Sequence, residues 1–264
     1  MFKKIFAAMA VAGLMGGAQA ITITNTTDAT ALANAIAGSG VTISNATLTY
    51  NTAVPAGTFT GANSAIGFDS GVVLTTGTTA CVGSTNTQGG CTGSGSYTSL
   101  KFDFVSASNS LFFNYVFGSE EYNYYVNSSY NDSFQLLLNG VNIAFLPGGT
   151  TPVTINNVNC LTNSSSYVNN VSGEGNDANC PNNNLPIELD GLTKVLTASA
   201  AIVAGQTYTF EFLITDVGDS SLDSAVMIQA GTFSDTETKV PEPASLLLAG
   251  LGLGALAARR RRAA

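Results

Sequence analysis

Residues 134–146 read FQLLLNGVNIAFL, and this stretch decides the fold class of the chain. Its two apolar runs flank Asn139-Gly140, a pair that suits the two central positions of a type I′ turn. Such a turn joins two antiparallel strands, because its twist matches theirs. The stretch therefore predicts a β-hairpin.

The segments on both sides of this hairpin alternate apolar and polar residues, which is the period of a strand with one buried face. Further strands are expected at residues 41–50, with an irregularity at Asn45, and at residues 71–76, 100–105 and 225–233. The side chains expected to share inner faces are Leu111, Phe113, Tyr115, Phe117, Tyr208, Phe210, Phe212 and Ile214. Many short strands predict an all-β fold, an antiparallel β-sandwich that is jelly-roll-like.

One short N-terminal helix is expected before these strands. It spans residues 28–37, with Thr27 or Asp28 as its N-cap and Gly38 as its C-cap.

The composition restricts the chemistry that the chain can perform. The 264 residues include no His and no Trp. Without His, Ser-His-Asp and Cys-His catalysis are excluded, short of unusual Lys-based variants. Within residues 21–240, three Lys stand against sixteen Asp and Glu, which leaves a net charge of −13. Such a surface repels nucleic acid and anionic lipid, and it suits divalent cations or simple solubility.

The N-terminus has the three parts of a cleavable secretion signal. Residues 1–20 read MFKKIFAAMAVAGLMGGAQA, in which Lys3 and Lys4 precede a short apolar run. Ala18 and Ala20 form a small-x-small cleavage site, and cleavage after Ala20 leaves Ile21 as the mature N-terminus.

The C-terminus has three parts as well. A linker over residues 237–243 contains Pro241, Glu242 and Pro243, and residues 244–264 contain an apolar stretch followed by a basic cluster. The basic residues are Arg259, Arg260, Arg261 and Arg262. As a helix, residues 244–258 would be roughly 22 Å long, which is shorter than the roughly 30 Å hydrocarbon core of a bilayer. The stretch can still insert as a transmembrane helix if the Arg side chains snorkel to the cytoplasmic face.

This tail resembles the PEP-CTERM sorting signal of Gram-negative bacteria. The resemblance implies recognition by an exosortase, cleavage near the Pro-Glu-Pro motif, and only a transient anchor in the inner membrane. The implied destination is the cell surface or the extracellular matrix. An uncut C-terminal anchor is the alternative.

Four cysteines lie in the part that is expected to be exported. An even number of cysteines in an oxidising compartment is typical of disulfides, and four allow three pairings. We predict the nearest-neighbour pairing, Cys81 with Cys91 and Cys160 with Cys180, because each closes a segment rich in Gly, Asn or Ser. Residues 156–184 contain few apolar side chains and are expected to form one long loop.

Three motifs of the exported part resemble the choice-of-anchor L domain and come in the order of that family. They are GFDSGVVLTTG at residues 67–77, VFGSEEYNYYVNSSYNDSFQLLLNG at residues 116–140 and ITDVGDSSLDSAVMIQAGTF at residues 214–233. The resemblance covers most of residues 21–236, which we take as one ectodomain. It implies a domain that occurs with various surface anchors, and it implies no biochemical activity.

Paired carboxylates leave one enzymatic alternative, a glycoside hydrolase. Glu120 and Glu121 are adjacent, so in an extended strand they point to opposite faces. A glycosidase would need one of them and a distant acid such as Asp216 or Asp223, roughly 5–10 Å away. Nothing in the sequence demonstrates that approach, so we expect no enzyme.

Non-catalytic functions therefore come first. The chain is expected to be a structural or adhesion module in exopolysaccharide or biofilm. A glycan-binding module is the alternative, because tyrosines gather where sugar rings would need stacking partners. They are Tyr122, Tyr124, Tyr125 and Tyr130, although packing at the rim of the sandwich is the explanation that we favour.

A calcium site is compatible with either function. Ca²⁺ takes six to eight oxygen ligands and needs no His. Residues 118–132 and 216–223 concentrate carboxylates and amides, and each segment follows a strongly apolar strand. Neither segment matches the EF-hand pattern, so two solvated acidic turns remain the alternative. The expected metal ligands are Glu120, Glu121, Asp132, Asp216, Asp219 and Asp223.

Overall fold

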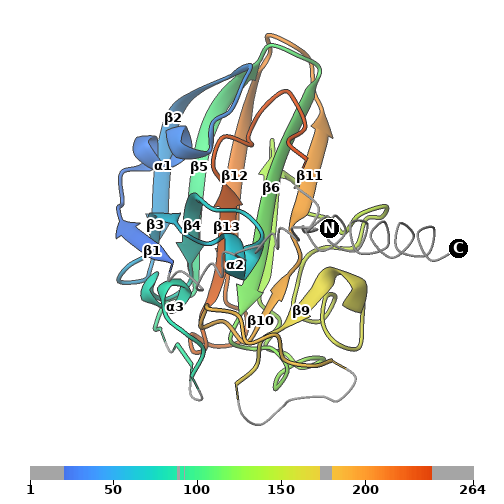
Figure 1. Ribbon diagram of the computed structural model, residues 1–264. Helices are drawn as coiled ribbons and strands as arrows, with labels where there is room; N and C mark the ends of the chain where they lie inside the picture. The colour runs from blue at the N-terminus through green and yellow to red at the C-terminus, as the bar shows by residue number, and fades with distance from the viewer. Residues whose placement is uncertain (1–20, 88–89, 92, 173–179, 240–264) are drawn as a thin grey trace, which may run out of the picture.

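The computed structural model describes residues 21–87, 90–91, 93–172 and 180–239. The predicted signal peptide, the Pro-Glu-Pro motif and the membrane tail lie outside these residues. The described chain forms two antiparallel sheets that pack face to face (Figure 1). The antiparallel β-sandwich expected from the sequence is confirmed.

The larger sheet has eight strands. Their order is β1 (Thr22–Asn25), β3 (Ala56–Thr60), β4 (Gly71–Thr75), β13 (Ser224–Gln229), β6 (Ser110–Ser119), β10 (Gly191–Thr193) and β9 (Tyr167–Asn169), with β11 (Leu196–Ala201) also paired to β6. The smaller sheet has five strands. Their order is β2 (Val41–Tyr50), β5 (Tyr97–Ser106), β12 (Thr207–Thr215), β7 (Ser133–Leu138) and β8 (Val141–Asn142).

Aromatic side chains fill the space between the sheets. Phe210 of β12 meets Phe113 of β6 edge to face, with ring centroids 5.4 Å apart, and Phe233 at 5.0 Å. Phe102 and Phe212 complete this centre, and all five rings are buried. Edge-to-face pairs of this kind add stability beyond the area that they bury. The inner faces expected for β6 and β12 are therefore confirmed, apart from Tyr208, which is only partly buried.

The larger sheet is also covered on its outer face. Val73, Val116 and Met227 of its central strands are buried there against Phe59 and Leu189. Central strands buried on both faces are apolar throughout rather than alternating, as the sequence of β4 already is. This second layer places the segment before β10 against the sheet.

The predicted hairpin is present but its second strand is short. Asn139 and Gly140 have φ of 48° and 82°, the two positive values of a type I′ turn, and Leu138 pairs with Val141. Pairing ends at Asn142, whose side-chain Oδ1 accepts N–H bonds from both Leu136 and Ala144. The Asn142 side chain thus accepts the bond from the Leu136 N–H that a backbone carbonyl of a longer second strand would have accepted.

Local expectations elsewhere were partly correct. The irregularity near Asn45 is a register shift in the β2–β5 pairing, with φ of 52° at Asn45. Helix α1 (Ala29–Ile36) begins after Asp28, whose carboxylate accepts from the Ala31 N–H as an N-cap should. Its C-cap is Ala37 rather than Gly38. Two further helices of four residues, α2 (Asn63–Ile66) and α3 (Ala80–Gly83), were not expected.

Two boundaries were wrong. Strand β13 ends at Gln229 instead of Phe233, because the chain turns at Gly231 with φ of 69° and brings Phe233 into the core. Residues 156–184 are not one loop, since a 3₁₀ turn (Ser164–Ser166) and strand β9 interrupt them. None of the helices in the described part of the chain has the length and apolar character that a bilayer crossing requires.

Both disulfides pair as predicted. Cys81 is bonded to Cys91 and Cys160 to Cys180, with Cα–Cα distances of 5.5 and 5.7 Å.

Candidate functional site

Acidic residues gather at one end of the sandwich, the lower end in Figure 1, where β6 finishes beside β10. Glu120 and Glu121 follow β6, and Asp223 precedes its neighbour β13, so the antiparallel pair Ser119–Ser224 brings them together. In the same way, Asp216 follows β12 and Asp132 precedes β7, next to the pair Thr215–Ser133. The topology therefore unites segments that are about a hundred residues apart in the sequence.

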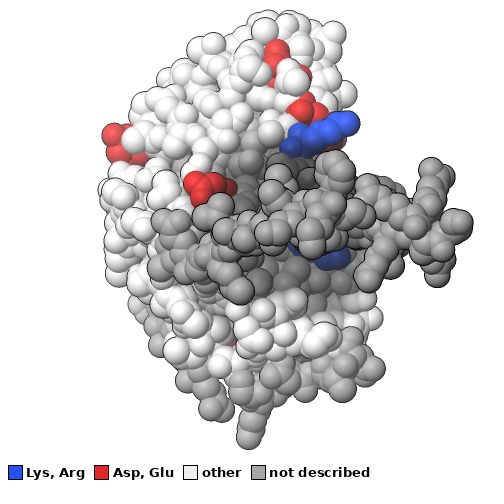
Figure 2. Space-filling view, in the orientation of Figure 1, with Lys and Arg blue, Asp and Glu red and all other residues white. Residues whose placement is uncertain are grey.

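These carboxylates lie inside the protein rather than on it. Glu120 is 2% exposed, Glu121 1%, Asp132 0%, Asp216 5% and Asp223 1%. On the face shown in Figure 2, the lower end is accordingly almost free of acidic atoms where it is not grey. A charge in such surroundings is costly unless hydrogen bonds or an opposite charge compensate for it.

Glu121 belongs to one group of acids, which we call the Glu121 group: Glu121, Asp132, Asp216 and Asp219. Asp132 is held by two bonds, since its Oδ1 accepts from the Val217 N–H at 2.9 Å and its Oδ2 from the Ser224 hydroxyl at 2.6 Å. By contrast, both carboxylate oxygens of Asp216 and Oε2 of Glu121 are buried without a hydrogen-bond partner. Asp219 is exposed, and its Oδ1 caps the Ser221 N–H.

Glu120 faces a different group, which we call the Glu120 group: Asn86, Glu120, Glu188 and Asp190. Glu188 and Asp190 come from the segment before β10, and Asn86 comes from the segment closed by Cys81–Cys91. The Asn86 amide donates to Asp190 Oδ1 at 3.0 Å and to the Asn170 carbonyl at 2.7 Å. These bonds fix the orientation of the amide, so its oxygen points elsewhere, and that oxygen and Glu120 Oε1 are buried without partners.

The sequence did not identify three members of the Glu120 group. Residues 185–190 read LPIELD, in which Glu188 and Asp190 alternate with the apolar Ile187 and Leu189. All four side chains are buried. Acids within an apolar segment are the signal that would have predicted their burial. Glu120 and Glu121 point to separate groups, as expected for neighbours in an extended chain.

Asp223 holds the residues on both sides of the segment that the Cys81–Cys91 disulfide closes. Its Oδ1 accepts from the Gly93 N–H at 2.7 Å, and its Oδ2 accepts from the Thr78 N–H at 3.1 Å. The Asp223 N–H donates to the Cys91 carbonyl, and the Asp223 carbonyl accepts from the Glu120 N–H. Burial raises the pKa of the Asp223 carboxyl, while the two N–H bonds oppose the rise.

Burial shifts the pKa of the remaining buried acids upward. It raises the pKa of Glu120 to about 10, with help from Asp190, and that of Glu121 to about 8, with help from Asp132. Burial likewise raises the pKa of Asp216 to about 8, and that of Asp132 and Asp190 to about 6. In each case the charged form is disfavoured first by the loss of water and then by nearby acids.

Basic side chains do not compensate for these acids. In the described ranges, the ion pair present is Lys101 with Glu211, with Nζ and Oε2 3.8 Å apart, and it involves neither group. Within the same ranges, no three or more Asp, Glu, His or Cys side chains already stand together as metal ligands. The two groups are therefore buried, of one sign, and incompletely hydrogen-bonded.

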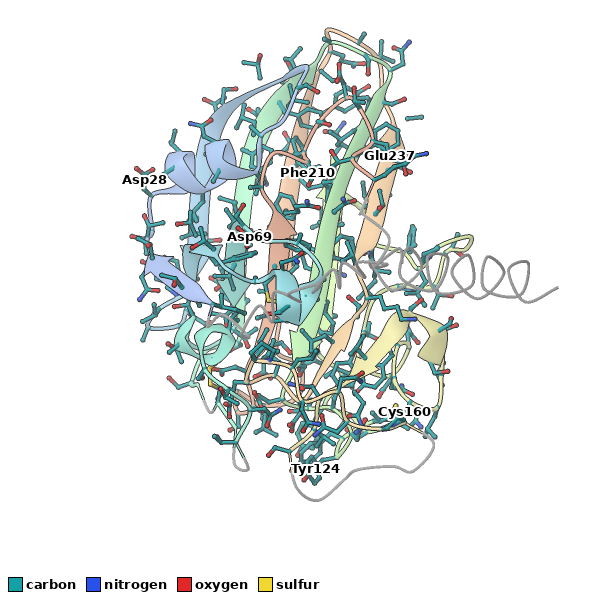
Figure 3. The ribbon with its side chains drawn as sticks, viewed as in Figure 1. Asp28, Asp69, Tyr124, Cys160, Phe210 and Glu237 are labelled. Atoms are coloured by element: carbon teal, nitrogen blue, oxygen red, sulfur yellow. A yellow bond between two sulfur atoms is a disulfide. The ribbon has the colours of Figure 1, made fainter. Side chains whose placement is uncertain are left out.

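The four tyrosines considered for sugar stacking fall into two classes. Tyr122 is fully buried and packs against Tyr167, with ring centroids 4.8 Å apart. Tyr124, labelled in Figure 3 at the lower end, is 49% exposed, and Tyr125 is 37% exposed. Tyr130 packs edge to face against Tyr125 at 5.2 Å. Packing thus explains Tyr122, while Tyr124 and Tyr125 offer ring surface to solvent.

An antiparallel sandwich closed by two disulfides defines the class of the protein, an exported β-sandwich domain. The chain belongs to the choice-of-anchor L domain family, which matches residues 20–234. A PEP-CTERM protein-sorting motif matches residues 239–262, so the protein is an exosortase-sorted surface protein that is exported to the surface or beyond. Both resemblances noted in the sequence are thereby confirmed. No curated protein and no solved structure matches the chain.

Proposed function

We propose that this protein is a non-catalytic structural or adhesion module that is held in the exopolysaccharide matrix of the cell. The observation that carries the proposal is the arrangement of the two matches. The domain match ends at residue 234 and the sorting motif begins at residue 239, so the matched domain is followed almost directly by the sorting signal. This order suits a chain whose role is to bring an intact domain to the cell surface.

The geometry of the acids supports a non-catalytic role. A glycoside hydrolase needs two carboxyl groups that face one sugar from opposite sides. Here the structure does bring Glu121 into one group with Asp216, but both carboxyl groups are almost fully buried. A polysaccharide chain cannot reach carboxyl groups in that position without opening the end of the sandwich.

Glycan binding is the second candidate, and the exposed rings of Tyr124 and Tyr125 favour it. An aromatic ring that is half exposed can stack on the apolar face of a sugar. The edge-to-face contact with Tyr130 orients Tyr125, which lowers the entropic cost of ordering it on binding.

Matrix retention can be tested in the native host. The protein is followed by immunodetection in the matrix and in the medium, in cells that make exopolysaccharide and in cells that do not. We expect it in the matrix of the first and free in the medium of the second. An identical distribution in both strains would overturn the proposal.

Glycan binding is tested by a matched pair of double variants of the exported protein. Tyr124→Ala/Tyr125→Ala removes the exposed rings at the lower end, and Tyr50→Ala/Tyr97→Ala removes two rings that are 41% and 37% exposed on the smaller sheet. A glycan-binding module loses affinity for the host's own exopolysaccharide with the first pair alone. Equal affinity of both variants would exclude Tyr124 and Tyr125 as the binding surface.

A further inference from the structure

Four side chains at the acidic end carry buried oxygens that lack the partners buried polar atoms normally have. The unpartnered atoms are Glu120 Oε1, Asn86 Oδ1, Glu121 Oε2 and both carboxylate oxygens of Asp216. The three acids among them are at most 5% exposed. More than nine in ten buried polar groups find a partner, so a concentration of exceptions at one end indicates a ligand that supplies one.

When the three carboxyl groups are ionised, all of these atoms are acceptors, and that restricts the ligand. An acceptor is satisfied by a hydrogen-bond donor or by a cation. The lysine side chains of the described ranges form no ion pair with either group. A small cation that enters between the oxygens would satisfy them and remove the repulsion between the carboxylates.

We propose that the acidic end binds two calcium ions, one in the Glu120 group and one in the Glu121 group. The division follows from the neighbours of the two glutamates. Asp190 and Glu188 act on Glu120, whereas Asp132, Asp219 and Asp216 act on Glu121. The inference goes beyond the proposed role in the matrix and stands independently of it.

In the Glu120 group, hydrogen bonds leave one oxygen of each acid for the ion. The Thr87 N–H and hydroxyl both donate to Glu188 Oε1, at 3.1 and 2.8 Å. Asp190 Oδ1 accepts from Asn86 and from the Ser172 N–H. The ligands are therefore Glu188 Oε2, Asp190 Oδ2, Glu120 Oε1 and Asn86 Oδ1. This set of three carboxylates and one amide oxygen has the composition that calcium takes in proteins.

In the Glu121 group, Asp216 is the central ligand because both of its oxygens are available. Its own strand end fixes its backbone, since the Asp216 N–H donates to the Ser96 carbonyl at 2.9 Å. Glu121 Oε2 supplies a second carboxylate, and the exposed Asp219 a third. Asp132, whose two oxygens are already bonded, holds the Val217 and Ser224 segments in place around the ion.

Calcium fits these groups better than magnesium. Carboxylates of one sign repel one another, so the ligands converge only as the ion enters, and calcium tolerates six to eight ligands in flexible geometry. Magnesium demands an octahedron with several waters, which a buried group does not provide.

Equilibrium dialysis against calcium chloride tests the proposal on the full exported chain, in detergent and after removal of metal with EDTA. Glu188→Gln removes a ligand charge from the Glu120 group and keeps an oxygen for Thr87. Asp216→Asn removes a ligand charge from the Glu121 group, and the Asp216 oxygens have no side-chain hydrogen bond to lose. Asp69→Asn, on an exposed acid outside both groups, is the matched control.

We expect two ions per chain for the wild type and the control, and one for each of the other variants. At a hundred times its dissociation constant, each ion should raise the melting temperature by about 5–10 °C. A wild-type stoichiometry of zero or one would overturn the proposal even if a variant failed to fold. So would two ions in either variant, and equally strong binding of magnesium chloride would overturn the assignment to calcium.

Discussion

Asp223→Asn should destabilise the protein even when no calcium is present. The side chain is 1% exposed and accepts two backbone N–H bonds, from Gly93 at 2.7 Å and from Thr78 at 3.1 Å. Asparagine retains one acceptor oxygen, so its amide nitrogen must face one of these N–H groups. Rotation of the amide only exchanges the N–H that loses its partner.

The size of the effect follows from these contacts. A hydrogen bond to a charged group contributes about 1.5–3 kcal/mol, and a buried donor without a partner costs about 1–3 kcal/mol. Removal of a buried negative charge near Glu120 offsets part of the loss. We therefore expect the free energy of unfolding to fall by about 2–4 kcal/mol, which is roughly 5–15 °C in melting temperature for a domain of this size.

Urea unfolding in EDTA, with the disulfides intact, measures this loss. Asp216→Asn is the control, because it makes the same chemical change at a buried acid whose oxygens accept no hydrogen bond. Its stability in EDTA should be unchanged or higher, because burial raises the pKa of Asp216 to about 8, so that at neutral pH the ionised carboxyl of the unfolded chain opposes folding, and asparagine has no such cost. If Asp223→Asn is as stable as the wild type in EDTA, the stabilising role assigned to the bonds from Thr78 and Gly93 to Asp223 is wrong. An additional loss seen only in calcium would show that Asp223 is a ligand as well, as the sequence predicts.

Three more outcomes are expected. Gly77→Ala should prevent accumulation of folded protein, because a Cβ there would lie 1.8 Å from an oxygen of Asp223, whereas Gly149→Ala, with its nearest neighbour at 3.9 Å, should leave the yield unchanged. The double variant Cys160→Ala/Cys180→Ala should lose about 3 kcal/mol of stability in urea unfolding, because the bond closes a loop of 20 residues, and an unchanged midpoint would contradict this. Intact-mass analysis of surface-exposed protein from the native host should show that residues 246–264 have been removed, and persistence of the full tail would refute sorting by cleavage.

The fold was predictable where its causes are local. Asn139-Gly140 specifies a turn through the positive φ of two adjacent residues, and alternation specifies the inner face of β6 without any knowledge of its partners. The end of β8 was not predictable, because Asn142 stops the strand through a bond to Leu136, six residues away on the other strand. The same apolar pattern continues beyond it in the sequence, so periodicity alone extends the strand too far.

The site was predictable only in the part that the sequence places together. Glu120 and Glu121 stand in one acidic segment, and their divergence follows from the geometry of an extended chain. Asn86 and Asp190 are 104 residues apart, and their contact exists because the segment before β10 packs on the outer face of the larger sheet. No local pattern marks a contact of that kind, whereas acids within an apolar segment do indicate that Asp190 is buried.

The Cys81–Cys91 disulfide should strengthen calcium binding in the Glu120 group alone. Asn86, a ligand of that group, lies between the two cysteines, so the bond restricts the segment before the ion arrives. Closing a loop of 10 residues removes chain entropy that corresponds to about 2.7 kcal/mol, and at about 1.4 kcal/mol per factor of ten the affinity rises by at most about 100-fold.

Equilibrium dialysis of Cys81→Ala/Cys91→Ala should therefore show one site weakened by up to this factor and one site unchanged. The variant without Cys160 and Cys180 is the comparison, since the segment between these cysteines supplies no proposed ligand, and its described residues are hydrogen-bonded to the Glu120 group only through Asn170 and Ser172. If the two double variants bind calcium alike, the disulfide does not prepare the Glu120 group, and its contribution is confined to the stability of the fold.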